Sequence, residues 1–129
     1  MWRILIVDDH TLVRKAAMAL IDSDPDLRVC GEVATHEAGL KAIDTLRPDL
    51  VITDLSFDAV QGLSLVAQIS LRHPGLPMLV LSMHDEALYA DRALRAGARG
   101  YVAKHRMGET LLTAIRHALH ITPRWLGPA

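Results

Sequence analysis

Five short apolar segments alternate with segments in which apolar residues recur every three or four positions, and this alternation strongly constrains the fold. The apolar segments predict strands at residues 3–7, 27–33, 50–53, 78–81 and 100–103. The segments between and after them have the apolar spacing of amphipathic helices. Strands and helices that alternate with short connections form parallel sheets with right-handed crossovers. We therefore expect an α/β fold in which a five-stranded parallel sheet is flanked by five helices.

The length and charge of the chain exclude several classes of protein. The 129 residues are typical of one domain with its own core, and the net charge of −1 with dispersed basic residues is unlike that of a nucleic-acid-binding domain. The single cysteine, Cys30, excludes an internal disulfide and suits a reducing compartment. No apolar stretch approaches the roughly 18 residues of a membrane span. We expect a cytoplasmic domain that binds neither a membrane nor, by itself, nucleic acid.

The helical pattern ends near residue 120. The segment that follows contains two prolines and a glycine, a composition typical of a linker. We therefore expect one domain at residues 1–120 and a linker or tail at residues 121–129.

Acidic residues follow two of the predicted strands. Asp8 and Asp9 follow the first strand, and Asp54 follows the third. Ligand sites in open α/β sheets lie beyond the carboxyl ends of the strands, so the three carboxylates are expected at one edge of the sheet. Carboxylates about 4 Å apart repel by roughly 4 kcal/mol at an effective dielectric near 20. Such a group requires a cation, a shared proton or ample water, and it favours a site for a hard cation.

The fourth and fifth predicted strands also end in polar residues, Ser82 and Lys104. Mg²⁺ prefers oxygen ligands, and a carboxylate beside it can attack an electrophilic phosphorus. An ammonium and a hydroxyl would stabilise the transferred phosphoryl group. Taken singly, these acids are more often turn or helix-capping residues, and the lysine a surface residue. Their joint position at strand ends predicts a phosphoryl-acceptor site.

The same residues carry a resemblance to a known family. The chain resembles the receiver domain of two-component response regulators, and most closely the NarL/LuxR-type transcriptional regulators, over residues 2 to about 120. The matching motifs are Val7-Asp8-Asp9-His10, Asp54 with Gly62 eight residues later, Leu81-Ser82-Met83-His84-Asp85-Glu86 and Gly100-Tyr101-Val102-Ala103-Lys104. The resemblance implies the doubly wound, flavodoxin-like (βα)5 receiver fold.

The resemblance also implies the chemistry of the site. Asp54 would accept a phosphoryl group from a sensor histidine kinase, and Lys104 would bind that group. Mg²⁺ would be held by Asp9, Asp54 and the backbone carbonyl of Ser56, with Asp8 acting directly or through water.

The resemblance further implies a two-state output. Ser82 would move toward the phosphoryl group and Tyr101 would turn inward behind it, as a switch pair. The domain would act as a signalling receiver that catalyses its own phosphoryl transfer and autodephosphorylation, not as an enzyme with a separate substrate. Relatives often form homodimers, and DNA binding would belong to a helix-turn-helix domain beyond residue 129.

Some residues depart from the family pattern and leave other functions open. Phe57 and Asp58 stand where a Met-Pro pair is usual, and His105 stands where many receivers have proline. The alternatives are a stand-alone receiver, an interaction module independent of phosphorylation, and a small phosphatase-like or nucleotide-binding enzyme. The chain has no glycine-rich phosphate loop, and Ser56 replaces the second acid that a phosphatase would carry, which argues against the enzymes.

Histidines flank the predicted site at His10 and His84. The resemblance implies that the second position can tune dephosphorylation. We expect both to be partly exposed loop residues.

Overall fold

The structure, a computed structural model, describes residues 1–55, 59–83 and 87–120. Strands and helices alternate along the chain as β1 (Trp2–Val7), α1 (Thr11–Asp22), β2 (Leu27–Val33), α2 (His36–Leu46), β3 (Leu50–Asp54), α3 (Ala59–Arg72), β4 (Met78–Ser82), α4 (Ala87–Ala96), β5 (Gly100–Ala103) and α5 (Met107–Ala118). The strands pair in parallel in the order β2-β1-β3-β4-β5, which confirms the predicted α/β fold.

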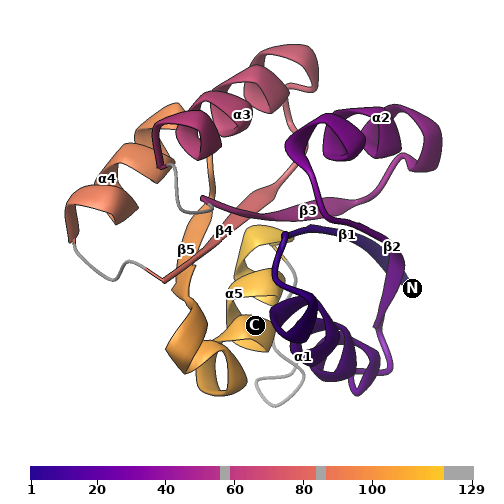
Figure 1. Cartoon of the computed structure of the whole chain (residues 1–129). Helices are drawn as coiled ribbons and strands as arrows, with labels where there is room; N and C mark the ends of the chain where they lie inside the picture. The colour runs from indigo at the N-terminus through magenta and orange to yellow at the C-terminus, as the bar shows by residue number, and fades with distance from the viewer. Residues whose placement is uncertain (56–58, 84–86, 121–129) are drawn as a thin grey trace.

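Helices cover both faces of the sheet (Figure 1): α1 and α5 lie on one face, and α2, α3 and α4 lie on the other. Alternate residues of β1 supply both cores. Ile4 and Ile6 belong to the apolar cluster that includes α1 and α5 residues, whereas Leu5 and Val7 belong to the cluster on the opposite face. Because both faces of the central strands are covered, their side chains are almost entirely apolar and fully buried.

The register of the strands brings their carboxyl ends to one edge of the sheet. Val7 of β1 pairs with Thr53 of β3, and Ser82 of β4 pairs with Ala103 of β5. The residues that follow these positions therefore lie near one another, although they are far apart in the sequence. Lys104 begins a single 3-10 turn, Lys104–Arg106, between β5 and α5.

Three strands are one residue longer than the sequence predicts: β1 begins at Trp2, and β3 and β4 end at Asp54 and Ser82. Asp54 still pairs with Leu81, and Ser82 still pairs with Ala103, so both polar residues are strand residues. The backbone ladder continues past the apolar run because pairing depends on the main chain and not on side-chain polarity.

The start of α3 approaches the end of β3 very closely. A Cβ atom added at Gly62 would lie 2.6 Å from Cα and 2.7 Å from the carbonyl oxygen of Leu55. Glycine at this position therefore lets α3 pack against the backbone that directly follows Asp54.

Among the residues that the structure describes, no helix combines the length and the apolar character that crossing a membrane requires.

Candidate functional site

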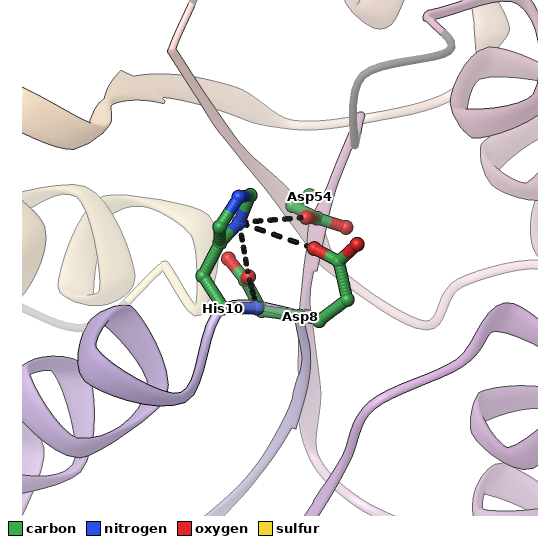
Figure 2. Close-up of side chains that lie close together, drawn as sticks. Asp8, His10 and Asp54 are labelled. Atoms are coloured by element: carbon green, nitrogen blue, oxygen red, sulfur yellow. Dashed lines mark hydrogen bonds and ion pairs between the residues drawn. The ribbon is translucent and has the colours of Figure 1, made fainter.

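Three carboxylates meet at the carboxyl-end edge of the sheet, and we call Asp8, Asp9 and Asp54 the acidic cluster. One oxygen from each of them and a ring nitrogen of His10 all lie within 4.8 Å of one another. Figure 2 shows how Asp8, His10 and Asp54 point toward one another. The side chains of Asp8 and Asp54 are 0% and 2% exposed, whereas that of Asp9 is 39% exposed. The sequence predicted this convergence from the strand ends alone.

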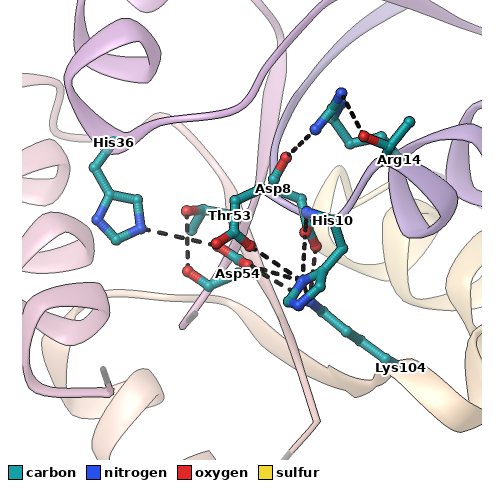
Figure 3. Close-up of polar contacts among 9 residues, drawn as sticks. Asp8, His10, Arg14, His36, Thr53, Asp54 and Lys104 are labelled. Carbon is teal, nitrogen blue, oxygen red and sulfur yellow. Dashed lines mark hydrogen bonds and ion pairs between the residues drawn. The ribbon is translucent and has the colours of Figure 1, made fainter. Parts of the chain in front are cut away.

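Lys104 reaches the acidic cluster from the turn after β5 (Figure 3). Its Nζ lies 2.9 Å from Oδ2 of Asp8 and 3.4 Å from Oδ2 of Asp54, and its side chain is only 4% exposed. The contact with Asp8 is close enough for an ion pair but lacks hydrogen-bond geometry. Within the described residues, Oδ2 of Asp8 is thus a buried oxygen without a hydrogen-bond partner.

The charges of this site are unbalanced. Burial raises the pKa of Asp54 above its ordinary value. Repulsion from Asp8 acts in the same direction, whereas the contacts with His36 and Lys104 oppose it. Carboxylate oxygens are the ligands that Mg²⁺ prefers, and Oδ2 of Asp8 has an ion pair with Lys104 but no hydrogen bond within the described residues. The residues present therefore fit a divalent cation.

His10 belongs to the acidic cluster more closely than the sequence suggested. Its ring is half exposed, as expected of a loop histidine, but Nδ1 lies 3.1 Å from Oδ1 of Asp8 and 3.1 Å from Oδ1 of Asp9. The same nitrogen lies 3.0 Å from Nζ of Lys104. The backbone N–H of His10 donates to Oδ1 of Asp8 at 2.7 Å, which fixes the turn that carries the ring.

His36 approaches Asp54 from the side opposite to Lys104 (Figure 3). It is the first residue of α2, and its Nε2 lies 3.8 Å from Oδ1 of Asp54. The interaction with Asp54 raises the pKa of His36. Sequence reasoning missed this residue. The available signal was that β2 runs parallel to β1, so the connection from β2 to α2 reaches the same edge of the sheet.

Arg14 holds the loop that carries the acids in place, and sequence reasoning did not identify this residue. Its Nη1 donates to the backbone carbonyl of Asp8 at 2.7 Å, and its Nε donates to Oε1 of Glu32 at 3.2 Å. The guanidinium thus ties the end of β1 to β2 and helps to hold the acidic cluster in place.

The remaining predicted residues are distributed as follows. Ser82 is buried at the end of β4, at the same edge as Asp54, and Tyr101 is a partly buried residue of β5 that packs in the core beside α3 and α4. Ser56, the third predicted ligand position, lies outside the described residues, as do Phe57, Asp58 and His84.

Comparison with known proteins links this geometry to one family. Residues 4–116 match the protein family described as the response regulator receiver domain. The chain is 32% identical over 115 residues to the nitrate/nitrite response regulator protein NarL of Escherichia coli, covering 89% of this chain and 53% of that protein. It is also 32% identical over 116 residues to the response regulator GacA of Pseudomonas viridiflava, covering 90% and 54%. The chain thus spans about half the length of these relatives.

A solved structure gives the same result. The two-component response regulator of the LuxR family from Aurantimonas sp. superposes with a TM-score of 0.86 at 31% identity. The match covers 93% of this chain and 86% of that one.

Proposed function

Because the chain belongs to the family of response regulator receiver domains, we propose that it is a phosphorylation-controlled switch with Asp54 as the acceptor. The phosphoryl donor would be a sensor histidine kinase, and the reaction would depend on Mg²⁺. The observation that carries the proposal is the environment of Asp54, which is buried between the ammonium of Lys104 and two further carboxylates. A carboxylate beside a cation site and a fixed ammonium is equipped to attack phosphorus.

Each residue of the site has a defined task in this reaction. An oxygen of Asp54 forms the bond to phosphorus while the bond from phosphorus to the donor's nitrogen breaks. Lys104, 3.4 Å from that carboxylate, stabilises the negative charge of the transferred group. The hydroxyl of Ser82 donates to a phosphoryl oxygen, and Tyr101 follows its movement as the second member of the switch pair.

A divalent cation at this site would be held by Asp9, Asp54 and the carbonyl of Ser56, with Asp8 bound directly or through water. When bound, Mg²⁺ supplies positive charge that offsets the charge of the transferring group. Asp8 contributes Oδ2, which is buried and without a hydrogen-bond partner within the described residues.

The output that we propose is control of transcription. The relatives are transcriptional regulators about twice as long as this chain, so residues 1–120 would be the receiver and residues 121–129 would lead to a DNA-binding domain. Phosphorylation would favour a homodimer, and the domain would act in the cytoplasm without binding DNA or a membrane itself. It would catalyse its own phosphorylation and autodephosphorylation and no other reaction.

Acetyl phosphate with Mg²⁺ tests this proposal directly. Intact-mass measurement should detect a phosphoryl adduct on the wild-type chain, and beryllofluoride with Mg²⁺ should shift NMR signals at the carboxyl ends of the strands. Asp54→Asn should abolish the adduct. Asp91→Asn is the matched control because this aspartate is 55% exposed on α4, and it should leave labelling unchanged.

The loop after Asp54 is tested by a double substitution. Phe57→Met with Asp58→Pro should change the rates of labelling and hydrolysis but not the labelled residue. If the wild-type chain forms no adduct under conditions that label a control receiver, the proposal is wrong and a phosphorylation-independent interaction module is favoured.

A further inference from the structure

The two oxygens of the Asp54 carboxylate have different neighbours. Oδ2 lies 3.4 Å from Nζ of Lys104 and 3.9 Å from Nδ1 of His10. Oδ1 lies 3.8 Å from Nε2 of His36, which approaches from the opposite side (Figure 3). The ammonium that would stabilise a phosphoryl group is thus beside Oδ2. We therefore expect Oδ2 to bond to phosphorus, which leaves Oδ1 facing His36.

We propose that His36 is a catalytic residue for hydrolysis of the phosphorylated aspartate, and that it acts by donating a hydrogen bond from Nε2 to Oδ1 of Asp54. The inference rests on the proposed function, because it concerns the lifetime of the phosphoryl group that Asp54 would carry. Lys104 and Ser82 would stabilise the phosphoryl group itself, whereas His36 stabilises the carboxylate that the phosphoryl group leaves behind.

Hydrolysis returns a negative charge to Asp54. The oxygen of a water molecule forms a bond to phosphorus while the bond from phosphorus to Oδ2 breaks. The electron pair of the broken bond stays on the carboxylate, and both protons of the water remain on the released phosphate. Before cleavage Oδ1 is the carbonyl oxygen of a neutral acyl group, and after cleavage it shares a full negative charge. A donor at Oδ1 therefore binds the departing carboxylate more strongly than the phosphorylated form, which accelerates cleavage.

The same hydrogen bond should have little effect on phosphorylation. The transition state of phosphoryl transfer is loose, so the bonds from phosphorus to the entering and the leaving atoms are both weak. In phosphorylation Asp54 starts as a carboxylate and keeps most of its charge in the transition state. In hydrolysis that charge has to develop from a neutral acyl group. Loss of the donor should therefore slow hydrolysis selectively, whereas general distortion of the site would slow both reactions.

The first turn of α2 is held in the position that this role requires. Oγ1 of Thr35 caps the helix by accepting a hydrogen bond from a backbone N–H of the first turn at 3.1 Å. Gly39 lets α2 pack closely against β1, because a Cβ atom there would lie 2.9 Å from Cγ2 of Val7. The 3.8 Å between Nε2 of His36 and Oδ1 of Asp54 exceeds a hydrogen bond. Catalytic contacts of this kind often tighten only in the reacting complex.

The electrostatics of Asp54 support the same role. Burial raises the pKa of Asp54, and the contact with His36 is the largest of the effects that oppose this rise, ahead of Lys104. The interaction with Asp54 in turn raises the pKa of His36. Both directions mean that His36 stabilises the charged carboxylate, which is the form that hydrolysis produces.

The decay of the phosphoryl adduct measures this role. The chain is labelled with acetyl phosphate and Mg²⁺, the acetyl phosphate is removed by desalting, and intact-mass measurement follows the loss of the adduct. His36→Ala should slow the decay about tenfold, which corresponds to one hydrogen bond of about 1.4 kcal/mol, and should change the labelling rate by less than about twofold. His36→Gln places an amide N–H near the position of Nε2 and should restore the decay to within about threefold of the wild-type rate.

His73→Ala is the matched control. Nε2 of His73, which follows α3, lies 3.2 Å from Oδ1 of Asp44 on α2, so this variant removes another histidine–aspartate pair. It should leave the rates of labelling and decay unchanged. Urea denaturation of each variant checks that the chain is folded at the assay temperature.

The possible outcomes separate this inference from the proposed function. If the adduct forms but decays in His36→Ala at the wild-type rate or faster, the inference is wrong and the receiver function stands. Equal slowing of labelling and decay, or equal slowing of decay in His36→Ala and His36→Gln, would also overturn the hydrogen bond as the cause. A wild-type chain without an adduct, under conditions that label a control receiver, would refute the proposed function and this inference with it.

Discussion

Neutralising the phosphoryl acceptor should stabilise the metal-free fold. Oxygens of Asp8 and Asp9 lie within 4.8 Å of an oxygen of Asp54, and each pair at that distance repels by about 3.5 kcal/mol at an effective dielectric near 20. Attraction to Lys104 at 3.4 Å returns about 5 kcal/mol. The remaining repulsion of about 2 kcal/mol agrees in sign with the raised pKa of Asp54. In Asp54→Asn, Lys104 keeps its ion pair with Asp8.

We therefore expect Asp54→Asn to raise the free energy of unfolding by about 2 kcal/mol at pH 8 in EDTA, which for this length raises Tm by about 7 °C. Urea denaturation followed by circular dichroism measures the change. Asp91→Asn is the matched control and should stay within about 0.5 kcal/mol of the wild type. Saturation with Mg²⁺ at 100 times its Kd should stabilise the wild type by about 2.7 kcal/mol and the variant by much less.

Destabilisation of Asp54→Asn in EDTA would refute this reasoning. It would mean that attraction to Lys104 outweighs the repulsion within the acidic cluster, so that the cluster needs no further cation.

Three further substitutions test the parts of the fold that hold the site. Gly62→Ala should destabilise the fold by about 2 kcal/mol or more, because the new Cβ would lie 2.6 Å from backbone, whereas Gly108→Ala meets nothing within 4 Å and should be neutral or stabilising in thermal unfolding. Arg116→Ala should cost about 2 kcal/mol in urea, because Nη2 donates to both oxygens of Asp24 at 2.8 Å, and Arg116→Lys should recover only part of this. The pKa of His36 is raised in the folded state by its interaction with Asp54. The ion pair therefore stabilises the fold fully at pH values below the unfolded pKa near 6.5. This contribution, about 1 kcal/mol, is lost as the pH rises through the folded pKa. His36→Ala should remove that part of the pH dependence in EDTA, and an unchanged profile would contradict the assignment.

The sequence predicted the sheet well because its strands are buried on both faces. All five residues of β4 are buried, and the run that encodes such a strand is almost continuously apolar. The ends of the strands were less predictable. The main chains of Asp54 and Ser82 remain paired with neighbouring strands. A polar residue at the end of an apolar run does not indicate in the sequence whether its main chain is paired.

The sequence placed His10 beside the predicted site but not within the acidic cluster, and it missed His36, for a different reason. The ring of His10 joins the acidic cluster because a turn closed by Asp8 directs it there. His36 reaches Asp54 because α2 packs beside β1. The placement of His36 depends on how a connection packs against elements distant in sequence, whereas that of His10 depends on a local side-chain hydrogen bond, and apolar periodicity records neither. The acids were predictable because their positions follow from the strands alone.

The charges of the site also give a physical reason for a switch at Ser82, given the proposed phosphorylation. Three carboxylates and the ammonium of Lys104 leave a charge of −2, which a divalent cation balances. A phosphoryl group carries about −1.5 to −2 near neutral pH, so replacing the single charge of Asp54 restores an excess of negative charge in a buried site. Lys104 and the cation would already interact with the acidic cluster, so a further hydrogen-bond donor to the phosphoryl group would be needed. Ser82 carries a buried hydroxyl at the same edge, and its movement toward the phosphoryl group would open space into which Tyr101 of the neighbouring strand can turn.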